Sequence, residues 1–249
     1  MKKLITLAAI AAGLLMANTQ AAVFEFDGAT GTGNAIDAPV NGNITTDCGT
    51  QGRDLCTVDH TLGFDYLVDG VSVNVTAYGG GALGQDGFIR GDADTLIQDL
   101  IGLNQGLGVI SAAEGNLINS SSDQINMETG ESILFTFAAE TKITDIFVND
   151  GLGNDCPGGG LEGVCGAIGI IVDGGMLQTF TDFLAAGIIA SGGEALELIG
   201  TTFEFVSLTP GGGYSIEALT AVPVPGAIPL LISGLAGLGF ASRGKKKAA

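Results

Sequence analysis

Residues 62–78 read LGFDYLVDGVSVNVTAY and carry the clearest structural signal in the chain. Asp69 and Gly70 stand between two runs in which apolar and polar side chains alternate. Alternation with a period of two is typical of a strand with one buried face, and Asp-Gly between two such runs favours a tight turn. The stretch therefore predicts an antiparallel β-hairpin.

Similar runs lie on both sides of this hairpin. A second hairpin is expected from residues 132–138 (SILFTFA) and 142–149 (KITDIFVN), with Glu140 and Thr141 as its turn. Further strands are predicted at residues 23–27, 107–111, 166–173, 201–208 and 213–220.

Three other stretches are less regular. Residues 94–103 (DTLIQDLIGL) fit either a short helix or an irregular strand. Residues 183–190 fit a helix that Gly192 and Gly193 would end. The polar section that runs from residue 28 to Thr61 is expected to be a loop.

Glycine supplies 42 of the 249 residues, and Gly, Asn and Asp clusters separate the predicted strands. About eight to ten short strands with turn signals between them, and no alternation of strands with helices, are typical of an antiparallel sandwich or jelly roll. No repeat of fixed period is visible. The expected fold is therefore all-β, an antiparallel β-sandwich that is jelly-roll-like, over residues 22–220.

The first 21 residues have the pattern of a secretory signal peptide. Lys2 and Lys3 precede an apolar core at residues 4–16, and Thr19 and Ala21 supply small residues at the exit. We expect cleavage after Ala21. The alternative is an N-terminal anchor that is not cleaved.

The last 29 residues, 221–249, have three parts in a fixed order. Prolines hold the first part extended, and it consists of Val222, Pro223, Val224 and Pro225. An uncharged run of 17 residues, 226–242, follows. Its length is at the lower limit of roughly 17 residues for a membrane-spanning helix. The basic cluster behind it, which the positive-inside tendency would leave in the cytoplasm, contains Arg243, Lys245, Lys246 and Lys247.

This tail resembles the C-terminal sorting signals of bacterial PEP-CTERM proteins, and more closely their VPLPA-CTERM variant. It lacks the glutamate of Pro-Glu-Pro, and it has Val224 and Gly226 where the variant usually has Leu and Ala. The resemblance implies recognition by an exosortase, a membrane enzyme that cleaves near the proline element and releases the protein to the surface or matrix. An ordinary C-terminal membrane anchor is the alternative.

The resemblance extends into the globular part. Residues 62–150 and 213–242 look like the region common in proteins with this tail, including the Gly-Leu-Gly-Val step at 106–109 and Asp-Gln-Ile at 123–125. It leaves the cysteine-containing loops without a counterpart and says little about biochemistry.

Charge restricts the partners of the mature chain. Six of the nine Lys and Arg lie in the two terminal segments, so only Arg53, Arg90 and Lys142 remain against all 27 Asp and Glu, a net charge near −24. Such a charge repels phosphate backbones and disfavours nucleic acid as a partner. It favours divalent cations, and calcium candidates are Asn149, Asp150 and Asp155, although they lack the spacing of a calcium loop.

The four cysteines form two local pairs. Cys48 and Cys56 lie eight positions apart, Cys156 and Cys165 nine apart, and each pair sits in a Gly- and Asp-rich segment. An exported chain meets an oxidising compartment, so we expect disulfides Cys48–Cys56 and Cys156–Cys165. A tetrahedral zinc site, the alternative, would need closer spacing such as Cys-x-x-Cys.

No motif indicates catalysis. His60 is the only histidine, which excludes sites built on two histidines, and no serine elbow accompanies it. Residues 79–84 match G-x-G-x-x-G only by letter, without a strand–helix context. Carboxylate pairs are too abundant to be informative.

These observations predict an exported, non-enzymatic protein of a Gram-negative bacterium. Its expected course is the inner membrane, an exosortase-type enzyme, and then the cell surface or extracellular matrix, in association with exopolysaccharide or biofilm. A secreted glycan-binding module, with or without dependence on calcium, is an alternative. It would need an exposed aromatic platform from Tyr66, Tyr78 and Tyr214, since the chain has no Trp. A secreted hydrolase is a further alternative. No cofactor is expected.

Overall fold

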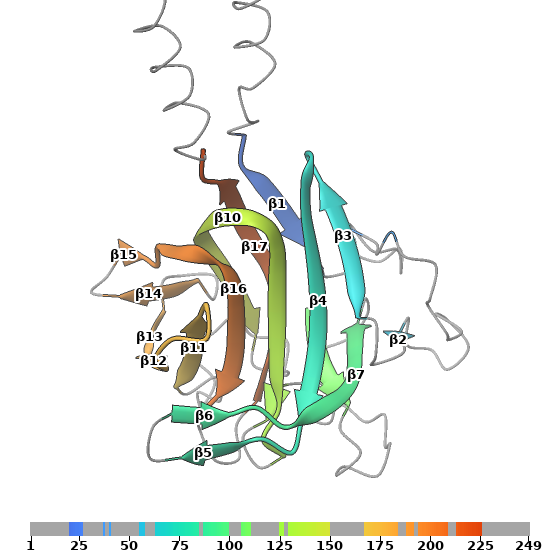
Figure 1. The fold of residues 1–249 in the computed structure, drawn as a ribbon, viewed down its shortest axis with the longest axis vertical. Coiled ribbons are helices and arrows are strands. Elements are labelled where there is room, and N and C mark those ends of the chain that lie inside the picture. Colours follow the sequence, from blue (N-terminus) through green and yellow to red (C-terminus); the bar gives the residue numbers. More distant parts are fainter. Residues whose placement is uncertain are drawn as a thin grey trace, which may run out of the picture.

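A computed structural model describes residues 20–26, 37, 40, 55–57, 63–84, 87–99, 106–110, 125–126, 129–149, 167–183, 188–191, 194–208 and 213–225. Within these ranges every regular element is a β-strand, and every pairing between strands is antiparallel. The all-β, antiparallel class predicted from the sequence is confirmed (Figure 1).

The strands of the described residues are numbered along the chain. They are β1 (Ala22–Glu25), β2 (Leu55–Thr57), β3 (Phe64–Val68), β4 (Val71–Gly79), β5 (Ala82–Gly84), β6 (Gly87–Ile89), β7 (Asp92–Asp99), β8 (Gly106–Ile110), β9 (Ile125–Asn126), β10 (Ser132–Asn149), β11 (Ile168–Val172), β12 (Gln178–Phe180), β13 (Asp182–Phe183), β14 (Ile189–Ser191), β15 (Glu194–Ala195), β16 (Leu198–Ser207) and β17 (Gly213–Pro223).

The hairpin predicted at residues 62–78 is confirmed as β3 and β4. Val68 pairs with Val71, so the loop contains only Asp69 and Gly70, whose φ angles are 50° and 82°. Positive φ at both loop residues is the requirement of a type I′ turn, which Asp-Gly meets with little strain. Along β4, buried residues alternate with more exposed ones, as the sequence pattern predicts.

The second predicted hairpin is wrong, because residues 132–149 form one long strand, β10, that bends. Residues 132–137 pair with β4, residues 141–149 pair with β17, and the register against β16 shifts between Thr136 and Thr141. Glu140 and Thr141 make a poor two-residue turn, because such turns need positive φ and neither residue adopts it readily. Thr141 is instead buried within the strand.

The bend of β10 lets one continuous sheet fold over on itself. Its order is β1-β17-β8-β7-β4-β10-β16-β11-β12, and β17 also pairs with β10. Rings from the two facing parts meet in the core: Phe24 of β1 lies 6.2 Å from Phe137 of β10. Phe26, directly after β1, lies 5.9 Å from Phe135. The core is therefore enclosed between β1 and β17 on one side and β4, β10 and β16 on the other.

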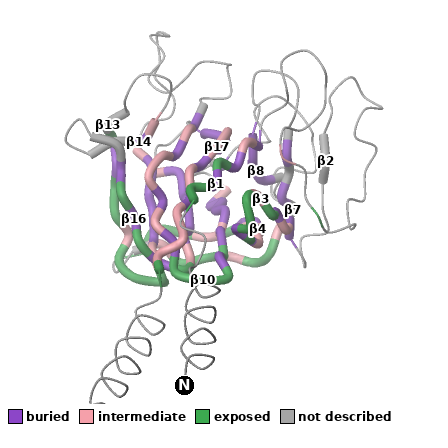
Figure 2. Tube along the Cα trace, turned by 90° about the horizontal axis from the view of Figure 1, so that it is seen from above, coloured by how far each residue is buried: buried purple, intermediate pink, exposed green. Residues whose placement is uncertain are grey.

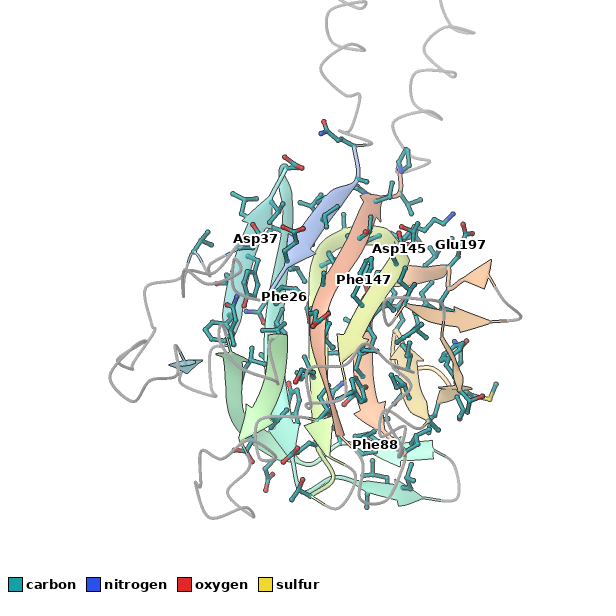
Figure 3. All side chains as sticks on the ribbon, turned by 180° about the vertical axis from the view of Figure 1, so that it is seen from behind. Phe26, Asp37, Phe88, Asp145, Phe147 and Glu197 are labelled. Carbon is teal, nitrogen blue, oxygen red and sulfur yellow. The ribbon has the colours of Figure 1, made fainter. Side chains whose placement is uncertain are left out.

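The ambiguous stretch at residues 94–103 is a strand in its described part, since β7 runs from Asp92 to Asp99. Leu96 and Gln98 share its buried face. The Gln98 side chain donates to the carbonyls of Phe26 (2.8 Å) and Asp37 (2.9 Å) and accepts from the hydroxyl of Tyr66 (2.9 Å). Phe26 and Asp37 lie on the same side of the molecule (Figure 3). A polar residue at a core position is what obscures the period-two signal here.

Two further expectations change in detail. The segment before Thr61 contains a short strand, β2, that pairs with β7, although we expected only loop. Residues 182–183, 189–191 and 194–195 form a small sheet of β13, β14 and β15 where a helix was one option. Phe147 of β10 makes an isolated bridge to Ile188 beside it.

Candidate processing site

The first and last described strands lie side by side. Ala22 pairs with Ala221 and Glu25 with Ala218, so the start of β1 is next to the end of β17. Ala22 and Ala221 are buried, whereas Gln20, Ala21 and Pro225 are exposed. The points at which the chain enters and leaves the sheet are therefore adjacent.

We call this part of the molecule the exit end. It comprises the start of β1, the end of β17, the bend of β10 at residues 138–140 and the Asp69-Gly70 turn, which all lie at the same end in Figure 1. Figure 2 shows exposed stretches at this end and buried stretches within the strands behind it.

The Val-Pro element continues β17. Val222 lies opposite Lys142, and Pro223 lies opposite Thr141. Pro223 is the last residue of the strand, where the missing N–H of proline is tolerated. The backbone N–H of Val224 then donates to the carbonyl of Glu140 at 2.9 Å. Three of the four residues of the element are thus held against β10.

The bend of β10 supplies the partner for this element. Ala138, Ala139 and Glu140 are exposed, and the hydroxyl of Thr141 donates to the carbonyl of Ala139 at 2.9 Å. In the same bend, the carbonyl of Glu140 accepts the hydrogen bond from the N–H of Val224. The sequence predicts a turn here and does not reveal the role of Glu140 and Thr141, because nothing in these two residue types indicates pairing with Val224 and Pro223, which lie more than 80 positions further along the chain.

A partly open hollow of about 230 Å³ lies beside Pro223. Its lining is mainly apolar and comes from three segments of the exit end: Gly70, Val71 and Ser72, then Phe137, Ala138, Ala139 and Thr141, then Pro223. Pro223 therefore borders the hollow even though the backbone on either side of it is paired.

The basic side chains of the described residues are Arg90 and Lys142, and both are in ion pairs. Lys142 lies 2.6 Å from Glu197 at the surface near the bend, where Glu197 is labelled in Figure 3. Arg90 makes two contacts with the buried carboxylate of Glu204, at 2.8 and 2.7 Å, and lies over the ring of Tyr78 at 4.6 Å. Its hydrogen bond to Glu204 raises the pKa of Arg90. Glu204 also accepts a hydrogen bond from the hydroxyl of Ser132 at 2.8 Å, which connects β16 to β10.

The tyrosines do not form the platform that a glycan-binding module would need. Tyr66 and Tyr214 are fully buried, and burial raises the pKa of both phenols well above the ordinary value. Tyr78 is half-buried and carries Arg90 on its face. An exposed flat surface of these three rings is therefore absent from the described residues.

Several predicted sites fall outside the description. The predicted site residues that the structure does not describe belong to the signal peptide, the basic tail, the calcium candidates, the cysteine pairs and the single histidine. They are Thr19, Arg243, Lys245, Lys246, Lys247, Asp150, Asp155, Cys48, Cys156, Cys165 and His60. Cys56 lies on β2 and Asn149 ends β10, but their side chains are not described. The disulfides, the calcium candidates and both terminal signals stay predictions.

Two observations concern the described part alone. No group of three or more His, Cys, Asp or Glu side chains within it could hold a metal ion. It also holds no helix that is long and apolar enough to cross a membrane, and residues 226–242 are not part of it.

Comparison with known proteins gives no relatives. No family model matches the chain, and no curated protein or solved structure is significantly similar to it.

Proposed function

We propose that this chain is an exported surface or matrix protein, processed at both ends and sorted by its C-terminal tail through an exosortase-type membrane enzyme. The mature part is a non-enzymatic, antiparallel β-sandwich associated with exopolysaccharide. The observation that carries the proposal is the pairing of Ala22 with Ala221, which brings the two predicted processing points to one end of the domain.

This arrangement suits a domain held at a membrane from both sides of its sequence. The signal peptide and the tail would both enter the bilayer beneath the exit end, and the folded sheet would project away from it. Export of the sheet needs no separation of the two ends, since β1 and β17 are neighbours. The strongly acidic mature chain, with a predicted charge near −24, would remain soluble after release.

The geometry also supports the non-enzymatic assignment. The buried acid Glu204 is fully engaged by Arg90 and Ser132, and the ring faces of Tyr66 and Tyr214 are buried in the core. Glu204 thus holds neighbouring strands together, which is the expected character of a structural residue. The buried hydroxyls of Tyr214 and Ser215, by contrast, have no hydrogen-bond partner among the described residues.

The test is the fate of the chain in a Gram-negative host that has an exosortase. Intact-mass analysis of the surface fraction should show loss of residues 1–21 and of the basic tail. A variant in which Lys245, Lys246 and Lys247 are replaced by Gln, together with Arg243→Gln, should accumulate unprocessed.

A matched control replaces the surface pair residues Lys142 and Glu197 by Gln, which alters charge outside the tail and should leave processing intact. If the wild-type chain stays in the cytoplasm with both ends uncut, the proposed function is wrong.

A further inference from the structure

We propose that Val222, Pro223 and Val224 are part of the folded domain, and that the processing enzyme contacts Pro223 in place but cuts the chain at or beyond the bond between Pro225 and Gly226. The inference rests on the proposed sorting function and adds where the cut falls.

The backbone of the element is occupied on its β10 side. Val222 and Pro223 lie in register with Lys142 and Thr141, and the N–H of Val224 is bonded to the carbonyl of Glu140 at 2.9 Å. Proteolytic enzymes bind their substrates as extended chains through free backbone groups, as added strands do. The backbone groups of Val222 to Val224 that face β10 become free for such binding only after β17 separates from β10.

Separation at this place would expose the core. Leu219 and Ala221, just before the element, are fully buried, and Ala221 also pairs with the buried Ala22 of β1. Opening the end of β17 therefore breaks pairing on two edges and brings apolar surface into water, which opposes local unfolding. Pro225, by contrast, is exposed and follows Val224, whose N–H makes the last backbone hydrogen bond found along the described part of β17 and its extension.

Recognition does not require that separation. Pro223 lines the hollow of about 230 Å³ between the Asp69-Gly70 turn and the bend of β10. An apolar side chain of the enzyme can reach the ring from there while the backbone stays paired. The folded domain then protects the peptide bonds of β17 from cleavage, and the enzyme cuts only beyond the strand.

Amide hydrogen exchange of the full-length chain in detergent tests the pairing without any sorting enzyme. The Val224 amide should exchange about tenfold or more slowly than in an unstructured peptide. A variant with Gly-Ser-Gly-Ser inserted between Ala221 and Val222 moves the element out of register, and Val224 should lose its protection. The matched control carries the same insertion after Pro225 and should keep it.

Fast exchange of Val224 in the wild-type chain, or equal protection in the two insertion variants, overturns the pairing. The position of the cut is read from the intact mass of the protein released by the host, which should end at Pro225 or later. A released protein that ends between Ala221 and Val224 overturns the inference and leaves the sorting function standing. A chain that is exported but keeps residues 226–249 refutes the sorting function, even if Val224 is protected.

Discussion

Glu204 is a buried carboxylate on β16 that accepts hydrogen bonds from Arg90 and Ser132. In the variant Glu204→Gln, an NH2 group replaces one carboxylate oxygen, and its N–H donors then face the donors of Arg90 or Ser132. A hydrogen bond to a charged group contributes about 1.5–3 kcal/mol to the free energy of unfolding. We expect the free energy of unfolding to fall by about 2 kcal/mol, measured by urea denaturation.

The surface pair provides the control. Glu197 lies 2.6 Å from Lys142 but its side chain is 64% exposed. Because exposed ion pairs contribute little, Glu197→Gln should change the free energy of unfolding by about 0.5 kcal/mol or less. Equal losses in the two variants would show that burial of Glu204 is not what makes its pair matter.

Asp173, in the turn after β11, should make stability depend on pH. Hydrogen bonds from the N–H of Thr202, then from the hydroxyl and N–H of Thr201, lower the pKa of Asp173. A carboxyl whose folded pKa lies below its unfolded value of about 3.9 stabilises the fold above that pH and loses this effect as the pH falls through the folded pKa.

The variant Asp173→Asn removes the charge and keeps a residue that tolerates the φ of 50° found here. At pH 7 its melting temperature should be lower than that of the wild type. The gap should narrow as the pH is lowered from about 4 toward 2, because the wild-type carboxyl becomes neutral. A gap that stays constant over this range in thermal denaturation would contradict the assignment.

At the scale of the elements, β8 approaches β17 so closely that a side chain does not fit between them. A Cβ on Gly106 would lie 2.5 Å from the carbonyl oxygen of Ile216, and the φ of Gly106 is 117°. Gly80 also has positive φ, 76°, but no atom lies within 4 Å of its Cβ position. A side chain at either glycine therefore brings backbone strain, and at Gly106 it adds the loss of space against β17.

We expect Gly80→Ala to lower the free energy of unfolding by about 1 kcal/mol, the cost of positive φ for a residue with a Cβ. Gly106→Ala should cost about 1–3 kcal/mol more, because β8 must move away from β17. Urea denaturation of both variants measures the difference. Equal losses would mean that β8 shifts freely and that its contact with β17 adds little.

The strands could be predicted from the sequence wherever local signals decide them. Asp69 and Gly70 fix a turn by their own conformational preferences, so β3 and β4 follow directly. In β10, the alternation of apolar residues correctly gives two extended halves, but whether a chain bends or reverses between them depends on partners. Those partners, β4 and β17, are distant in sequence.

In the candidate processing site too, local features could be predicted from the sequence, whereas contacts with distant residues could not. The Val-Pro element is visible in the sequence, and prolines alone predict its extended backbone. Its pairing with Glu140 and Thr141 is not visible, because hydrogen bonds between backbone groups leave no trace in side-chain type. Gln98 is a further case, since its three buried hydrogen bonds make a polar residue suitable for the core of β7.

For the whole molecule, the dominant feature is the imbalance of charge. All 27 acids of the chain fall between residues 25 and 217, where only three basic side chains oppose them. Two of these, Arg90 and Lys142, are engaged with Glu204 and Glu197. The acids therefore far outnumber the basic side chains that could neutralise them, and repulsion among like charges opposes compaction.

Salt should consequently stabilise the folded domain. Raising sodium chloride from about 10 mM to about 200 mM shortens the Debye length from roughly 30 Å to below 10 Å, so repulsion between distant acids is screened. The melting temperature should rise by several degrees over this range. At equal ionic strength, millimolar calcium and magnesium should then give equal shifts if only screening acts. A larger shift with calcium, abolished by Asp150→Asn with Asp155→Asn, would instead reveal a specific site that uses these two carboxylates. A melting temperature that falls with sodium chloride would show that attractive ion pairs, such as that of Arg90 with Glu204, outweigh the repulsion.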